Sequence, residues 1–210
     1  MLEPLLSHKR FQELHKSILY PQDPGRVNRY VKSVWIKYQI AYYMQPASIV
    51  ELGVRAGYSA WAMRLGCPQA QMTCYDNYAP NIHVDGKAIH AHAKKLLKNI
   101  GAKLVIADTQ TLSKLPLVDL YHVDADHRTE PERNDIMLCL RSNPKAVLVI
   151  HDAKAAHVGV AISQARKDCK RKTCCEYIDS DWGDSIVSSE PQLWIDNIVP
   201  FDESLVKKDT

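Results

Sequence analysis

From Ser48 onward, short apolar runs alternate with stretches of helical periodicity, and no other feature of the sequence constrains the fold as strongly. The runs are rich in the branched and aromatic residues of buried strands, and most are far enough apart for a helix to lie between them. The five runs are SIVEL (48–52), MTCYD (72–76), KLVIA (103–107), VDLYHVD (118–124) and AVLVIHD (146–152). The helices are predicted over 57–65, 87–99, 130–141 and 156–168. This alternation favours a parallel sheet with helices on both faces.

The residues before this alternation have helical periodicity alone. Apolar side chains at helical spacing predict one helix over 7–19 and a second from Val27 to Met44. The segment PQDPG (21–25) separates the two, because two prolines and a glycine break a helix. The second helix carries four aromatic residues, Trp35, Tyr38, Tyr42 and Tyr43. These side chains could pack onto the rest of the chain, line a ligand pocket or form a dimer seam.

After Lys172 the pattern changes to two apolar runs without a helix between them, CCEYI (174–178) and QLWID (192–196). Two such strands, joined by a polar loop that includes DSDWGDS (179–185), are most simply antiparallel. We therefore predict an α/β fold, doubly wound, with a mostly parallel, seven-stranded, Rossmann-like sheet, an antiparallel C-terminal hairpin and an N-terminal helical extension. The predicted divisions are an extension over 1–45, a domain over 46–200 and a tail over 201–210.

Composition narrows the class of protein. Apolar residues make up 46% of the 210 residues and charged residues 24%, as in ordinary globular proteins, and the net charge of +3 favours neither nucleic acid nor a membrane surface. No apolar run approaches the roughly 20 residues of a spanning helix, and the start lacks the apolar stretch of a signal peptide. None of the six cysteines forms a CxxC pair. We expect a soluble protein of the reducing cytoplasm.

The residues that end the predicted strands point to a ligand site. In an open α/β sheet, ligands bind beyond the carboxyl ends of the strands, near the point where strand order reverses. An acidic residue ends each of the five runs: Glu51, Asp76, Asp108, Asp124 and Asp152. Each alone could be a turn or cap residue, but five at equivalent positions favour a binding role. His122 lies inside an apolar run and is predicted to be a hydrogen-bonded core residue.

The first of these turns, ELGVRAGYS (51–59), indicates which ligand fits. Its glycines, Gly53 and Gly57, have the spacing GxxxG and not the GxGxxG of dinucleotide sites, and the lysine of a P-loop is absent. A nucleoside without phosphates therefore suits this loop better than NAD or ATP. Asp76 could then accept hydrogen bonds from both ribose hydroxyls, and Asp108 one from an exocyclic amine such as that of adenine.

Residues 46–170 resemble the class I S-adenosylmethionine-dependent methyltransferases. IVELGVRAGYSA is similar to the first motif of that family and YDNY to the second. DLYHVDADH followed by AVLVIHD resembles a subgroup of small-molecule O-methyltransferases that includes catechol-type and macrolide-sugar enzymes. The resemblance implies S-adenosylmethionine as cofactor, with cofactor contacts from Glu51, Gly53, Gly57, Ser59, Asp76, Asp108, Thr109 and Asp124.

The resemblance also implies a catalytic centre. It makes His127 the general base, beside Asp124, and it makes Asp124 and Asp152 ligands of a divalent metal. A hydroxyl is a weak nucleophile near pH 7 and needs either a base or a cation that favours its alkoxide. The family has Asp-Asn, or an acid before Asp, where this chain has His151 and Asp152. An imidazole among the ligands suits Mn²⁺ better than Mg²⁺, and the alternative is that Asp152 only orients His127 or the acceptor.

The sequence thus predicts an enzyme that transfers a methyl group from S-adenosylmethionine to a hydroxyl of a small molecule, with an optional Mg²⁺ or Mn²⁺. An amine acceptor and a homodimer are open. A nucleic-acid methyltransferase is disfavoured because VDADH replaces the NPPY-type motif. The remaining alternatives are an NAD-dependent oxidoreductase and a non-catalytic nucleoside-binding protein.

Overall fold

The computed structural model describes residues 24–78, 86–170, 172–180 and 182–201. The helix predicted over 7–19 lies outside these ranges. The described helices are α2 (Pro24–Met44), α3 (Tyr58–Gly66), α4 (Gly86–Asn99), α5 (Thr129–Ser142) and α6 (Ala156–Asp168), with the 3₁₀ helices η1 (Thr109–Thr111) and η2 (Leu193–Asn197). The strands are β1 (Ser48–Leu52), β2 (Gln71–Asp76), β3 (Lys103–Ile106), β4 (Leu120–Val123), β5 (Val147–Ile150), β6 (Cys174–Ile178) and β7 (Asp184–Ser188). No helix in these ranges is both long and apolar enough to cross a membrane.

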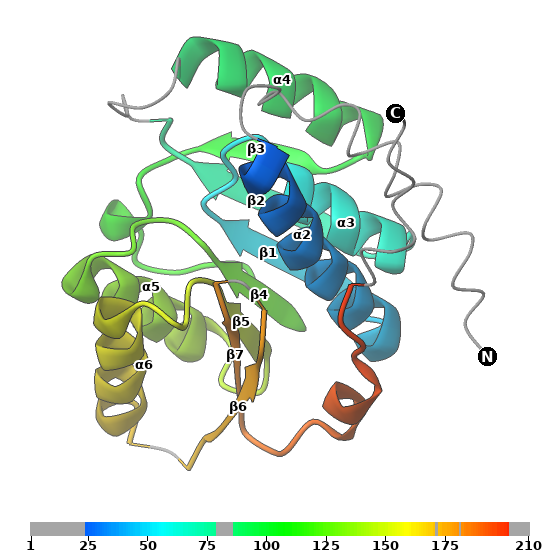
Figure 1. Ribbon diagram of the computed structural model, residues 1–210. Coiled ribbons are helices and arrows are strands. Elements are labelled where there is room, and N and C mark those ends of the chain that lie inside the picture. Colours follow the sequence, from blue (N-terminus) through cyan, green and yellow to red (C-terminus); the bar gives the residue numbers. More distant parts are fainter. Residues whose placement is uncertain (1–23, 79–85, 171, 181, 202–210) are drawn as a thin grey trace.

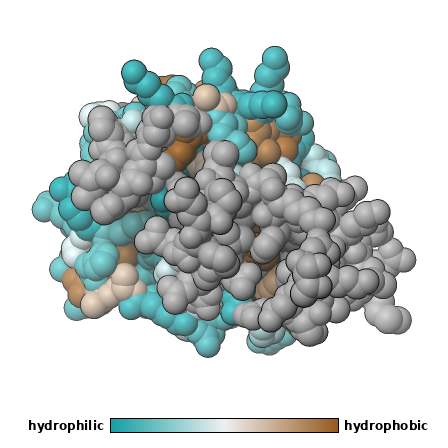
Figure 2. All heavy atoms as spheres, turned by 45° about the horizontal axis from the view of Figure 1, so that its top comes forward, coloured by the Kyte–Doolittle hydropathy of each residue, from teal (hydrophilic) through white to brown (hydrophobic). Residues whose placement is uncertain are grey.

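The strands form one seven-stranded sheet in the order β3-β2-β1-β4-β5-β7-β6. The first five are parallel, and β7 runs antiparallel to both of its neighbours. Buried residues of α2, α3 and α4 pack on one face of the sheet, and those of α5 and α6 pack on the other. Figure 1 shows this layering, which confirms the predicted doubly wound fold. The face in Figure 2 is largely hydrophilic where it is coloured, with smaller hydrophobic patches between the hydrophilic side chains.

The C-terminal hairpin differs from the prediction. QLWID is not a strand: it lies mostly in η2. The last strand is instead DSIVS (184–188), which begins inside the segment predicted as a polar loop. All five residues of this strand are buried, and its polar side chains are matched by partners elsewhere in the chain, such as Lys37 for Asp184. Sequence periodicity cannot show such partners, so the polar residues look like a loop.

Helix α2 packs against α3, and its buried residues Trp35 and Gln39 are hydrogen-bonded to Val199 of the C-terminal segment. A Cβ on Gly66 of α3 would lie 2.3 Å from the carbonyl oxygen of Tyr38, so glycine permits the close approach of the two helices. The Gln39 amide exchanges two hydrogen bonds of 2.9 Å with the backbone of Val199, and the Trp35 indole donates to the same carbonyl. Trp35, which is 7% exposed, also stacks on Tyr38. For Trp35, the packing interpretation is confirmed.

Candidate active site

The order of the sheet reverses between β1 and β4, and open α/β sheets bind their ligands at the carboxyl ends of the strands at such a point. Gly53, directly after β1, has a φ of +83°, and a Cβ there would lie 2.1 Å from the carbonyl oxygen of Asp124. Glycine is therefore required where the two loops meet. Gly57, with a φ of +85°, gives the turn into α3. Both predicted glycines thus shape the loop between β1 and α3.

Several residues after the strands adopt backbone conformations that are unfavourable for side chains. Arg55 after β1, Tyr78 after β2 and Asp152 after β5 have φ values of +49°, +45° and +55°. Such conformations cost of the order of 1–3 kcal/mol each and are concentrated at functional sites. Three of them at one edge of the sheet support a site there.

Asp76, the predicted ribose ligand, ends β2 next to the loop after β1. Its Oδ2 accepts hydrogen bonds of 2.8 Å from the backbone N–H groups of Val54 and Arg55, and its Oδ1 accepts one of 2.6 Å from Tyr78. The carboxylate thus fixes the loop after β1 to the end of β2. A carboxylate has about four acceptor positions, so one remains for a ligand hydroxyl.

Asp108 and Thr109, the predicted adenine contacts, lie after β3. The Asp108 carboxylate accepts a hydrogen bond of 3.0 Å from the backbone N–H of Gln110 and so caps η1. Thr109 is buried. The cap accounts for Asp108 locally, and its contact with adenine stays a prediction.

Glu51 and Ser59, the predicted contacts for the methionine end of the cofactor, bond to each other. The Glu51 carboxyl is fully buried and accepts a hydrogen bond from the Ser59 hydroxyl, and it lies 2.9 Å from Nδ1 of His122. Burial raises the pKa of Glu51 to about 8, against the opposing Ser59 hydrogen bond, and burial lowers the pKa of His122 to about 3. Both groups are therefore mainly uncharged at neutral pH. His122 is confirmed as a hydrogen-bonded core residue.

We expect Glu51→Gln to stabilise the protein at pH 8.5 and to change its stability little at pH 4.5. The pKa of Glu51 is raised from 4.5 to about 8 in the fold, so between these values the folded state holds a proton that the unfolded state has released. Stability from this group therefore falls as the pH rises through that range. The gain at pH 8.5 should be on the order of a few kcal/mol, measured by urea unfolding. Equal effects at both pH values, or the same gain from the exposed control Glu190→Gln, would contradict this.

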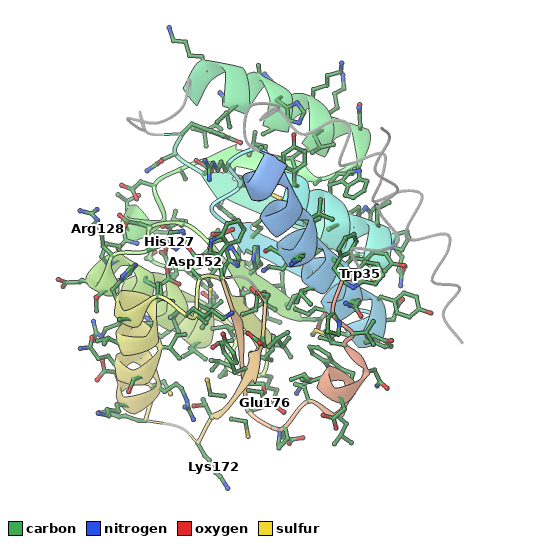
Figure 3. All side chains as sticks on the ribbon, viewed as in Figure 1. Trp35, His127, Arg128, Asp152, Lys172 and Glu176 are labelled. Carbon is green, nitrogen blue, oxygen red and sulfur yellow. The ribbon has the colours of Figure 1, made fainter. Side chains whose placement is uncertain are left out.

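Beyond β4 and β5, three of the predicted catalytic and metal residues come together. Nε2 of His127 lies 3.5 Å from Oδ1 of Asp124 and 3.4 Å from Oδ2 of Asp152. The three side chains are 34%, 27% and 26% exposed, so a ligand can reach them. Figure 3 shows His127 and Asp152 side by side at this edge of the sheet, with Arg128 pointing outward.

The His127 ring is surrounded by acids. Its Nδ1 lies 3.8 Å from Oε2 of Glu132, a fully buried residue of α5 whose two carboxylate oxygens have no hydrogen-bond partner among the described residues. Burial alone would lower the pKa of His127, but Glu132, Asp124 and Asp152 outweigh it and raise the pKa to about 9. The ring is therefore an imidazolium at neutral pH.

The predicted metal ligands, Asp124, Asp152 and His151, do not form a metal site. Within the described ranges, no group of three or more His, Cys, Asp or Glu side chains is arranged to hold a metal ion. The cationic ring of His127 lies between the Asp124 and Asp152 carboxylates, where a divalent ion would have to lie. Nδ1 of His151 faces Lys37 and Asp184, and its Nε2 lies 3.4 Å from Oδ1 of Asp152. The Mg²⁺ or Mn²⁺ prediction is therefore not supported.

Sequence reasoning missed three buried charged residues at this site: Lys37, Glu132 and Asp184. A lysine or glutamate within a helix is usually solvated, and Asp184 lies in a segment predicted as a loop. Glu132 follows Thr129 by three residues, which is the spacing of a capping box at the start of a helix. In the sequence it therefore looks like a capping residue and not like a partner of His127.

The comparisons with known proteins agree with this geometry. A model of the methyltransferase domain family matches residues 50–153. No curated protein sequence matches the chain.

Among solved structures, the chain is similar to an S-adenosylhomocysteine-bound methyltransferase of Podospora anserina, with a TM-score of 0.57 and 15% identity over 91% of this chain and 89% of that one. It is also similar to an O-methyltransferase of Bacillus cereus in complex with S-adenosylhomocysteine, with a TM-score of 0.55 and 12% identity over 87% and 90%. A third is a TDP-rhamnose 3′-O-methyltransferase of calicheamicin biosynthesis, with a TM-score of 0.56 and 14% identity over 90% and 95%.

The sheet order and the domain match together define a class of enzyme. This chain belongs to the S-adenosylmethionine-dependent methyltransferases.

Proposed function

We propose that this methyltransferase methylates a hydroxyl group of a small molecule, with His127 as the general base. The observation that carries the proposal is the convergence of His127, Asp124 and Asp152 at the carboxyl ends of β4 and β5. The printed names of two structural neighbours, an O-methyltransferase and a TDP-rhamnose 3′-O-methyltransferase, support a hydroxyl acceptor.

The cofactor half of the site would be formed by the loops that follow β1, β2 and β3. Asp76 would hold the ribose, Asp108 with Thr109 the adenine, and the loop from Gly53 to Ser59 the methionine end. Glu51 would act from beneath this loop, because its carboxyl bonds to Ser59. When bound, S-adenosylmethionine supplies a methyl group on a sulfonium. An aligned nucleophile attacks the methyl carbon, and the sulfur leaves on the opposite side.

The acceptor half requires removal of a proton. Methyl transfer forms an O–CH₃ bond, breaks the S–CH₃ bond and releases the hydroxyl proton, which His127 would accept at Nε2. The ring can do so only after it has lost its own proton, which the three surrounding carboxylates oppose. Asp124 and Asp152, on either side of Nε2, would stabilise the imidazolium that results.

We expect turnover to rise with pH, with the midpoint of the rise near the His127 pKa of about 9, because the deprotonated ring is the base. His127→Gln should lower kcat by about 100-fold or more and change affinity for S-adenosylhomocysteine little. The measurement is release of S-adenosylhomocysteine with catechol and TDP-rhamnose as probe acceptors. His157→Gln, on the exposed surface of α6, is the matched control. An active His127→Gln variant would rule out the proposed role.

Location in the cytoplasm is also proposed here. All six cysteines are free, which agrees with a reducing compartment. A homodimer stays a prediction.

A further inference from the structure

A buried charged cluster joins three distant segments beneath the candidate active site. Lys37 comes from α2, His151 directly follows β5, and Asp184 begins β7. The three residues are 1%, 8% and 0% exposed. Lys37 forms an ion pair with Oδ1 of Asp184, and its Nζ lies 3.1 Å from Nδ1 of His151.

Nδ1 of His151 lies 3.1 Å both from Nζ of Lys37 and from Oδ1 of Asp184, so it either accepts from the ammonium or donates to the carboxylate. An ammonium has three donors and no acceptor, and Lys37 has three acceptors within reach: Asp184 Oδ1, His151 Nδ1 and Ser33 Oγ at 3.2 Å. Asp184 Oδ2 accepts from the Ser180 hydroxyl at 3.2 Å. If every Lys37 donor is used, Nδ1 of His151 is an acceptor, and the proton of the neutral ring is on Nε2.

From His151 the polar chain continues to the surface. Its Nε2 lies 3.4 Å from Oδ1 of Asp152, and the other oxygen of Asp152 lies 3.4 Å from Nε2 of His127. These distances are long for direct hydrogen bonds, so the contacts are mainly electrostatic. Trp182 lies edge-on to the His151 ring, with centroids 5.7 Å apart, and limits its rotation. Asp152 is thus held between two imidazoles, in a backbone conformation that is itself unfavourable.

A buried ion pair is a poor way to stabilise a fold, because apolar residues of the same volume often serve as well or better. The position of this pair indicates another role. We propose that Lys37 and Asp184 are positioning residues of the active site: they fix the His151 ring so that its Nε2–H holds the Asp152 carboxylate beside His127. The proposal rests on the proposed function, in which His127 and Asp152 form the catalytic centre. It makes α2 a part of the active site.

The test is the double variant Lys37→Met/Asp184→Leu, which removes both charges and leaves the net charge unchanged. Because the net charge is the same, the long-range electrostatic field at His127 changes little. A shift in the titration midpoint of His127 therefore reports a change in the position of Asp152. The groups that face His127 are Asp124, Glu132 and Asp152. Once Asp152 is released, the titration midpoint of His127 should fall by about one pH unit, measured by NMR of ¹⁵N-histidine-labelled protein. An unchanged midpoint in the folded double variant would overturn the proposal.

The matched control is Arg133→Gln/Asp168→Asn, which removes the ion pair between α5 and α6 at the surface and should leave His127 unchanged. Calorimetry with S-adenosylhomocysteine distinguishes failure of the proposed function from failure of the positioning role of Lys37 and Asp184. If the wild-type protein does not bind S-adenosylhomocysteine, the proposed function is contradicted. The His127 titration tests the positioning role by itself.

A second measurement needs no variant and holds even if the double variant does not fold. In the wild type at pH 7, the ¹⁵N shifts should show that Nε2 of His151 is protonated and that Nδ1 is not. A proton on Nδ1 would mean that His151 donates to Asp184, and the proposal would be wrong.

Discussion

Replacing Lys37 by Met alone is expected to lower the free energy of unfolding at pH 7 by about 3–5 kcal/mol. The substitution leaves the Asp184 carboxylate fully buried without its cation. Burial opposes ionisation of Asp184, but the Lys37 ammonium outweighs it and holds the pKa of that carboxyl well below its usual range. The stability from this low pKa is present above the unfolded value of 3.8 and is lost in acid. Without Lys37 the carboxylate is a buried, poorly compensated charge at pH 7.

Urea unfolding of three variants checks this expectation. The double variant Lys37→Met/Asp184→Leu should recover most of the loss, because no charge is then left unpaired. The surface control Lys145→Met should change stability by less than about 0.5 kcal/mol. A Lys37→Met protein as stable as the wild type would show that the buried pair does not have the charges assigned to it.

Gly53→Ala is expected to destabilise the protein by about 2–5 kcal/mol and to weaken cofactor binding. The new methyl group would lie 2.1 Å from the carbonyl oxygen of Asp124 and 2.4 Å from its carbonyl carbon. Both contacts are backbone, so relief requires the loop after β1 to move away from the end of β4. The positive φ of +83° adds a further cost for alanine.

Gly159→Ala is the matched control for that substitution. A Cβ at Gly159, inside α6, would meet nothing within 4 Å. Alanine should therefore stabilise the helix by about 0.5–1 kcal/mol. Urea unfolding and calorimetry with S-adenosylhomocysteine measure the stability and the cofactor affinity of both variants. If Gly53→Ala were as stable as Gly159→Ala and bound S-adenosylhomocysteine as tightly, the close contact at Gly53 would not have the assigned effect.

The parallel part of the fold could be predicted from the sequence because its signal is local. The run SIVEL forms β1 with the predicted bounds, and MTCYD forms all but the first residue of β2. The last strand could not be predicted, because DSIVS is polar at its ends and is buried only through partners such as Lys37, on a helix 147 residues away along the chain. QLWID is apolar enough for a strand but lies at an exposed turn in η2.

The candidate site was predictable to the same extent. The rule that ligands bind at the carboxyl ends of strands identified Asp124, His127 and Asp152, and the structure brings these three together. Residue types alone could not show that the imidazole lies where the metal was expected. They also gave no sign of Glu132 or Lys37, because a buried partner is known only from tertiary contacts.

Calorimetry with S-adenosylmethionine and S-adenosylhomocysteine tests the central claim most directly. Wild-type protein should bind both with micromolar affinity, with no dependence on Mg²⁺ or Mn²⁺, and Asp76→Ala should abolish binding. Asp119→Ala is the matched control, because that carboxylate also accepts hydrogen bonds from Ser48, including its backbone N–H, but at the opposite edge of the sheet. Absence of binding by the wild type, or equal binding by Asp76→Ala, would contradict the site described here.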